Sequence, residues 1–103
     1  LASIVFTSSG VGRKGRAFWG GYAVSKFATE GIMQVLADEL GGISNIRVNS
    51  LKPGAVNTAM RRTAYPAEPP NTNPDPDALM PHWLYLMSDD SKDINGSALS
   101  AQS

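Results

Sequence analysis

Apolar and polar positions along the chain predict alternating strands and helices. Residues 3–8 (SIVFTS) combine β-branched and aromatic side chains with a small-residue end, which is typical of a buried parallel strand. Residues 22–40 repeat apolar side chains at helical spacing and are followed by two glycines, so they predict a helix with a C-terminal stop. Residues 46–51 (IRVNSL) alternate apolar and polar positions before a Pro-Gly pair and predict a second strand.

The remaining segments are distinguished by their glycine and proline content. Residues 10–21 hold five glycines and are predicted to form a loop. Residues 63–77 hold five of the seven prolines, which excludes a regular helix or a central strand and indicates a long, extended loop. A short helix over residues 79–88, with Pro81 near its start, and a third strand over residues 96–101 (GSALSA) complete the pattern.

The order strand, helix, strand, helix, strand predicts parallel strands joined by right-handed crossovers, and therefore an α/β fold. Three such strands make a poor free-standing unit, so we expect the second half of a doubly wound parallel sheet. The sequence opens at Leu1 inside a strand pattern and without an initiator methionine. We therefore expect residues 1–103 to be the C-terminal part of a single, longer domain.

One apolar stripe of the long helix is expected to face the sheet. The residues of this stripe are Val24, Phe27, Ala28, Gly31 and Val35. Glycine in the middle of a helix destabilises it by about 1 kcal/mol relative to alanine, and close packing is the usual reason for its presence. Gly31 is therefore expected to lie against a neighbouring element.

Composition narrows the classes of function. Hydrophobic residues make up 42% and charged residues 17% of the chain, as in an ordinary globular domain. Nine basic residues balance nine acidic ones, so nothing favours a nucleic acid or an anionic membrane as partner. The sequence has no cysteine, which excludes disulfides and thiolate catalysis. The single histidine, His82, has no acidic or histidine partner at ligand spacing, and we expect no metal site.

The sequence also carries no membrane signal. No apolar run approaches the length of a membrane span. The sequence does not open with the charged start and long apolar stretch of a secretory signal peptide. We therefore expect a cytoplasmic protein.

Three groups are expected to meet beyond the carboxyl ends of the strands, where open parallel sheets bind ligands. Ser9 follows the first strand, and Pro53 with Gly54 follows the second. Tyr22 and Lys26 open the helix between them, four residues apart and on one helix face. A free tyrosine, with a pKa of about 10, exchanges protons poorly at neutral pH, but an ammonium one turn away stabilises the phenolate. A serine hydroxyl can hydrogen-bond a substrate oxygen on which negative charge develops. This set suits carbonyl reduction or alcohol oxidation with a nicotinamide cofactor.

A Tyr-x-x-x-Lys pair is weak evidence by itself, because an aromatic residue beside a lysine is common on helix surfaces. The ordered combination is more specific: IVFTSSGVG, YAVSKFATEG, IRVNSLKPGAVNTAM and, more loosely, GSALSAQ. In these segments the chain resembles the short-chain dehydrogenase/reductase family over nearly its whole length. Its ALMPHWLYLMSDD tail is similar to a little-characterised bacterial oxidoreductase branch.

The resemblance implies a Rossmann fold and an NAD(P)-dependent oxidoreductase. It implies Ser9 as the active-site serine and Tyr22 as the general acid/base. Lys26 would have two roles, activation of the tyrosine and hydrogen bonding to the ribose of the nicotinamide. The family's glycine-rich fingerprint, its cofactor-selecting residue and its active-site asparagine would all lie upstream of this sequence.

The resemblance also implies how the cofactor and the substrate are held. Pro53, Gly54, Val56 and Thr58 look like the family's PGxxxT segment, which packs on the nicotinamide and holds its carboxamide. The cofactor would be NADP or NAD, the substrate a small carbonyl or alcohol compound, and residues 63–77 the substrate loop.

The resemblance further implies a homo-oligomer, a dimer or tetramer of the full-length chain. Helices of this type commonly pair between subunits in the family. Phe27, Met33 and Leu36 would supply such a face, the last two from outside the predicted sheet-facing stripe.

Two features of the sequence invite other interpretations. Residues 10–15 match G-x-G-x-x-G, the dinucleotide fingerprint, but that motif requires a helix that opens at those glycines, and none is predicted there. The basic residues of this loop, Arg13, Lys14 and Arg16, are expected to be solvated. The two arginines at positions 61 and 62 are candidates for contact with an anionic substrate or a cofactor phosphate.

Two other functions remain open at this point. The same Tyr–Lys pair serves an epimerase or dehydratase, in which hydride leaves and returns. Alternatively, the chain is a non-catalytic, truncated half-module whose exposed sheet edge associates with another chain.

Overall fold

The computed structural model describes residues 2–69 and 72–102 of the 103-residue chain. Three parallel strands, β1 (Ala2–Thr7), β2 (Ile46–Lys52) and β3 (Ala98–Ser100), form one sheet in the order β1-β2-β3. β1 pairs with β2 over its whole length, whereas β3 pairs only with the end of β2. The predicted parallel α/β sheet is confirmed.

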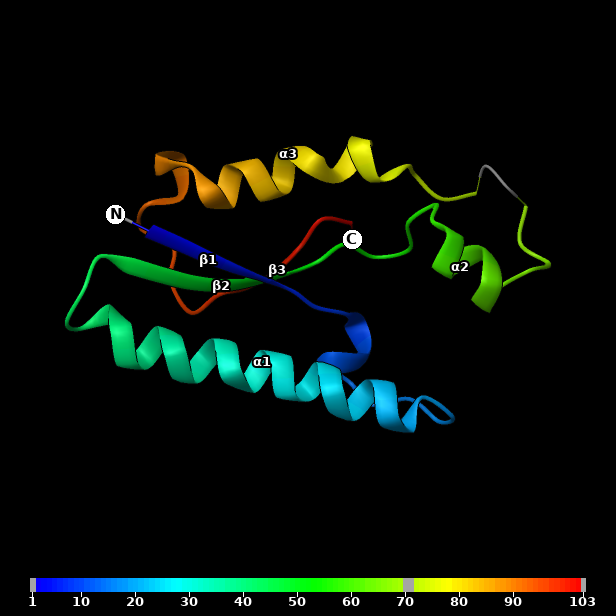
Figure 1. The fold of residues 1–103 in the computed structure, drawn as a ribbon, viewed down its shortest axis with the longest axis horizontal. Helices are drawn as coiled ribbons and strands as arrows, with labels where there is room; N and C mark the ends of the chain where they lie inside the picture. Colours follow the sequence, from blue (N-terminus) through cyan, green and yellow to red (C-terminus); the bar gives the residue numbers. More distant parts are fainter. Residues whose placement is uncertain (1, 70–71, 103) are drawn as a thin grey trace.

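A helix covers each face of the sheet (Figure 1). α1 (Gly20–Gly41) connects β1 to β2 and packs on one face, while α3 (Pro76–Met87) connects β2 to β3 and lies on the other. The short α2 (Ala59–Ala64) and the 3-10 turns η1 (Gly10–Gly12) and η2 (Asp89–Ser91) lie in the connections. The carboxyl ends of the strands, η1, α2 and the start of α1 share one end of the molecule, on the right in Figure 1.

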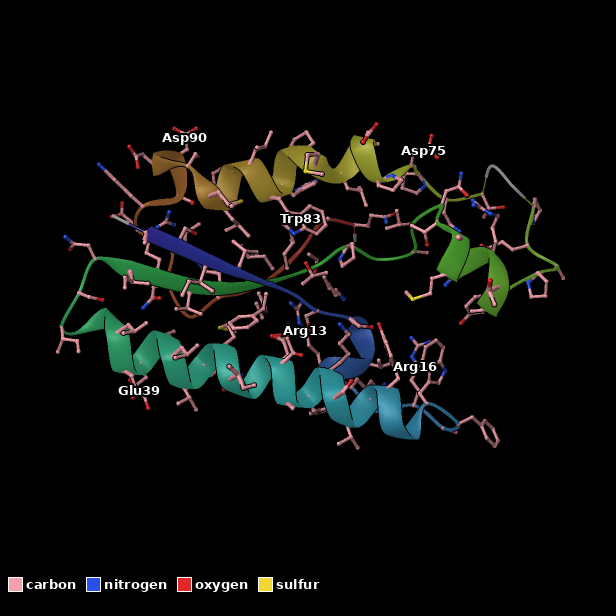
Figure 2. The ribbon with its side chains drawn as sticks, in the orientation of Figure 1. Arg13, Arg16, Glu39, Asp75, Trp83 and Asp90 are labelled. Carbon is pink, nitrogen blue, oxygen red and sulfur yellow. The ribbon has the colours of Figure 1, made fainter. Side chains whose placement is uncertain are left out.

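The main core lies between α1 and the sheet. The side chains that are buried there, or packed against the buried ones, are those of Met33, Ala37, Val48, Phe6, Leu36, Leu40 and Ile46. On the other face, Leu79 and Leu86 of α3 are buried. Trp83 points from α3 toward the sheet (Figure 2), and its indole N–H donates to Thr7 Oγ1 at 3.4 Å. Each face of the sheet is thus covered by apolar packing, as parallel sheets require.

The face of α1 that meets the sheet is not the predicted one. The residues of the predicted stripe are all exposed, with Val24 at 70% and Val35 at 56%. A Cβ added to Gly31 would meet nothing within 4 Å, so the expected close packing is also wrong. The buried residues of α1 are Ala23, Glu30, Met33 and Ala37. Apolar side chains occur around the whole helix, so their spacing does not single out one face. In addition, Glu30 makes the buried face look polar.

The corrected face changes the expected subunit interface. Met33 is 1% exposed and Leu36 packs against the same cluster, so both belong to the core of this chain. Phe27, the third residue assigned to that interface, is 47% exposed.

Several element boundaries also differ from the predictions. α1 begins two residues earlier than predicted, and part of the predicted glycine loop is the turn η1. The proline-rich loop is shorter at both ends, because residues 63–64 complete α2 and Pro76 starts α3. Proline suits the first helical turn, where its missing N–H leaves no bond unmade, while Pro81 lies inside α3. Residues 70 and 71 of the predicted loop, like Leu1, lie outside the described residues.

Candidate active site

The candidate site residues lie at the carboxyl-end edge of the sheet. Ser9 lies between β1 and η1, Tyr22 and Lys26 lie in the first two turns of α1, and Pro53 with Gly54 follows β2. Figure 1 shows these elements gathered at one end of the molecule. This edge is where open parallel sheets bind their ligands.

Ser9 is positioned by the turn that follows it. It caps η1 with an extended backbone (φ −151°, ψ 157°), and its hydroxyl accepts a bond from the Val11 N–H at 3.4 Å. Gly12 is buried, its N–H donates to the Ser9 carbonyl at 3.0 Å, and a Cβ at this position would meet the Lys26 carbonyl oxygen at 2.7 Å. η1 therefore lies directly against the turn of α1 that carries Lys26, so Ser9 and Lys26 belong to adjoining segments.

Tyr22 and Lys26 form a pair on α1. The Lys26 ammonium lies 5.6 Å from the centre of the Tyr22 ring and donates to the Thr7 carbonyl, at the end of β1, at 3.4 Å. Tyr22 is 41% exposed, and the ring of Trp19 lies 5.9 Å from it. The ammonium is thus held between α1 and the end of β1, beside the Tyr22 ring. The Tyr22 side chain stays partly exposed.

The segment after β2 is fixed by a residue that the sequence did not single out, Gln102. Its side-chain amide donates to the carbonyls of Pro53 at 2.7 Å and Ala55 at 2.8 Å. Gly54 has a φ of 80°, and a Cβ there would meet the Gln102 amide nitrogen at 2.9 Å, so the turn requires glycine. Thr58 caps α2 by accepting from the Arg61 N–H at 3.2 Å. The Pro-Gly segment is therefore held rigidly at the edge of the sheet.

A buried carboxylate behind the site was also missed. Glu30 is 5% exposed. Its oxygens accept bonds from Ser8 Oγ at 2.8 Å, Arg13 Nε at 2.8 Å and Ser50 Oγ at 2.5 Å. Burial raises the pKa of the Glu30 carboxyl, but the hydrogen bonds from Ser50, Arg13 and Ser8 and the charge of Arg13 outweigh it, so the pKa lies below its usual range.

The environment of Arg13 is therefore not the predicted one. Arg13 is bonded inside the molecule, whereas Lys14 and Arg16 are exposed as predicted. One sequence signal could have revealed the pair. Glu30 shares a helix face with Met33 and Ala37, and a carboxylate on a buried face needs donors or a cation from a neighbouring segment.

The two arginines after Thr58 bind other residues of their own segment. Arg61 pairs with Glu68, with Nη2 to Oε2 at 2.9 Å, and its guanidinium lies 3.8 Å from the centre of the Tyr65 ring. The hydrogen bond from Arg61 lowers the pKa of the Glu68 carboxyl, against a smaller effect of burial. Arg62 donates to Asn57 Oδ1 at 2.9 Å. Together with other residues of their segment, they line a cavity of about 130 Å³.

Other kinds of site find no support in the described ranges, 2–69 and 72–102. The helix after the G-x-G-x-x-G match opens only at Gly20, so those glycines do not present a helix N-terminus to a pyrophosphate. No group of three or more histidine, cysteine or acidic side chains within these ranges could hold a metal ion. None of the helices in them is long and apolar enough to cross a membrane.

A three-stranded parallel sheet between two helices, with Ser9, Tyr22 and Lys26 at its carboxyl edge, has the arrangement expected of the second half of a doubly wound α/β fold. The sequence model of short chain dehydrogenases matches residues 2–69. The chain belongs to the short-chain dehydrogenase family.

Known members of the family match this chain along almost its whole length. The oxidoreductase YciK of Escherichia coli K12 is 55% identical over 97% of this chain and 39% of its own length. The crystal structure of a short chain dehydrogenase from Salmonella enterica serovar Typhi superposes with a TM-score of 0.94 at 53% identity, over 98% of this chain and 41% of that one. A short chain dehydrogenase from Shigella flexneri 2a, crystallised with NADP, gives a TM-score of 0.92 at 54% identity, over 98% and 41%. The chain thus spans about two fifths of the length of these relatives.

Proposed function

We propose that the full-length protein is an NAD(P)-dependent oxidoreductase that interconverts a carbonyl and an alcohol by hydride transfer. One observation carries this proposal: the Lys26 ammonium is fixed 5.6 Å from the Tyr22 ring, beside the turn that holds Ser9. The proposal includes the domain organisation, in which residues 1–103 form the C-terminal part of a single dinucleotide-binding domain. The connection between α2 and α3, which lies within the predicted range 63–77, is its substrate loop.

Each residue of the trio has a separate role in the proposed reaction. Tyr22 delivers a proton to the substrate oxygen during reduction and removes it during oxidation. Lys26 stabilises the phenolate that results, from a position that its bond to the Thr7 carbonyl helps to fix. Ser9 donates a hydrogen bond to the same substrate oxygen, where negative charge develops. Within ranges 2–69 and 72–102, the Ser9 hydroxyl accepts from the Val11 N–H and donates to no other group, so its own proton is free for this bond.

The residues present fit a nicotinamide dinucleotide, which would supply or take the hydride. Gly54 turns the backbone after β2 through its positive φ, and it is exposed at the carboxyl edge of the sheet, where the nicotinamide would lie. Pro53, Val56 and Thr58, all half-buried, would hold the nicotinamide with it, and Lys26 would bind its ribose. The relatives from Shigella flexneri and Escherichia coli CFT073 that were crystallised with NADP and NADPH favour NADP over NAD.

The test is a net change in the oxidation state of the cofactor. The full-length protein, incubated with NADPH and a panel of aliphatic and aromatic aldehydes and ketones, is expected to oxidise NADPH in equal amount to the alcohol formed. The loss of absorbance of the reduced nicotinamide measures the first quantity, and chromatography measures the second. An epimerase or dehydratase would convert its substrate with no net oxidation, and a non-catalytic half-module would convert none. Either result would contradict the proposal.

A further inference from the structure

The buried polar cluster behind the site joins three elements through one carboxylate. Glu30 of α1 receives bonds from Ser8, at the end of β1, and from Ser50 of β2. Ser8, Glu30 and Ser50 are 3%, 5% and 0% exposed, so water does not compete for these bonds. A carboxylate with several donors in fixed positions specifies one arrangement of its neighbours, because each bond is directional.

Arg13 extends this cluster to the third strand. Besides its Nε bond to Glu30, its Nη2 donates to the Leu99 carbonyl at 3.0 Å and to Ser50 Oγ at 3.3 Å, and its Nη1 donates to Ser100 Oγ at 3.4 Å. Figure 2 shows Arg13 between α1 and the sheet. The planar guanidinium is suited to this bridge because its N–H donors point in several fixed directions at once.

The cluster lies directly behind the candidate catalytic residues in the sequence and in space. Ser8 precedes Ser9, and Arg13 follows η1, whose N-terminal cap is Ser9. Glu30 lies one helical turn after Lys26. The backbone N–H of Arg13 also donates to the Gly10 carbonyl at 3.1 Å, which closes the turn η1 from its other end. The ion pair therefore clamps both ends of the short segment that carries Ser9.

We propose that Arg13 and Glu30 act as a positioning pair that fixes the Ser9 hydroxyl relative to Tyr22 and Lys26. This inference rests on the proposed function, since it assigns the pair a role in the same reaction. Neither residue bonds to Ser9, Tyr22 or Lys26 through its side chain in the structure, so the pair acts through the backbone of residues 8–13. Apolar packing alone would leave that segment freer to slide along α1, and misplacement by about 1 Å lowers catalytic rates by about 100-fold.

The test combines changes in the pair with a change in Ser9, in the full-length protein. Arg13→Lys keeps a positive charge near Glu30 but loses the fork that reaches β3, and Glu30→Gln keeps the shape of the side chain but loses its charge. Each variant is expected to lower kcat by about 10- to 100-fold, with little change in the Kd for NADPH. The substrate in these assays is the aldehyde or ketone, from the panel used to test the proposed function, that the parent protein reduces fastest. Arg16→Met, an exposed position in the same loop, is the matched control and is expected to match the parent protein.

The decisive readout is the coupling to Ser9. If the pair acts through Ser9, Arg13→Lys and Glu30→Gln have no further effect on kcat once Ser9 has been replaced by Ala. Losses that multiply in the Ser9→Ala background would overturn the inference while leaving the proposed function intact, as would an unchanged kcat in both pair variants. An unchanged kcat in Ser9→Ala itself would show that the proposed role of Ser9 is wrong, and the inference would fall with it. Thermal unfolding of each variant shows whether a lower kcat comes from unfolding or from a displaced Ser9. If Glu30→Gln does not fold, Arg13→Lys alone is used for the coupling test.

Discussion

Replacing Tyr22 by Phe in the full-length protein is expected to lower kcat by about 100- to 10,000-fold, the range that a general acid/base contributes. The substitution removes only the hydroxyl. The phenyl ring keeps its contact with Trp19 and its position near the Lys26 ammonium, so the fold should be unchanged. Steady-state oxidation of NADPH with a reducible carbonyl compound measures the effect.

The binding of the dinucleotide supplies the control for this prediction. The Kd for NADPH is expected to change little in Tyr22→Phe, because Lys26 keeps its ammonium and its bond to the Thr7 carbonyl. Tyr85→Phe is a matched variant with the same loss of a phenol hydroxyl, at a position of α3 that is 44% exposed. It is expected to keep its turnover. A Tyr22→Phe protein that turns over at the parent rate would show that another group moves the proton.

The second large effect is expected at Gly12. A Cβ there would lie 2.7 Å from the carbonyl oxygen and 2.9 Å from the carbonyl carbon of Lys26, closer than real Cβ contacts. The neighbour is backbone of α1 and cannot rotate away, so in Gly12→Ala the turn η1 must move off the helix. Ser9 moves with the turn that it caps. We expect a loss in kcat of about 100-fold and a loss in stability of about 1–3 kcal/mol.

Gly10→Ala is the matched control for Gly12→Ala. It adds the same methyl group to the same turn, but a Cβ at Gly10 would meet nothing within 4 Å. Urea unfolding and kcat should both stay close to the parent values in Gly10→Ala. If the two alanine variants behave alike, the close approach of η1 to α1 is not what holds the site.

The fold could be predicted from the sequence because its strongest signals are local. Strands of β-branched residues, glycine and proline stops, and the order of elements were enough for a parallel α/β sheet. The buried face of α1 could not be predicted, because Val24, Phe27 and Val35 are as apolar as the residues that face the sheet. Glu30 made that face look polar. Only the long-range bonds of Glu30 to Ser8, Arg13 and Ser50 reveal why a charge is tolerated there.

The candidate site shows the same division between local and long-range information. The spacing of Tyr22 and Lys26 places both on one face of a helix, and this follows from helix geometry alone. The roles of Gly12 and Gln102 could not be inferred, because their neighbours, Lys26 and Pro53, come from segments distant in the sequence. Arg13 was predicted to be solvated for the same reason, since its partners on α1, β2 and β3 are brought to it only by the fold.

The most direct test of the account is a crystal structure of the full-length protein with a dinucleotide and an unreactive analogue of a reducible ketone. The account predicts that Ser9 Oγ and Tyr22 Oη both lie within about 2.6–3.2 Å of the same carbonyl oxygen, with the Lys26 ammonium on the ribose side of the phenol. A carbonyl oxygen that contacts neither hydroxyl, or two hydroxyls too far apart to share it, would contradict the account.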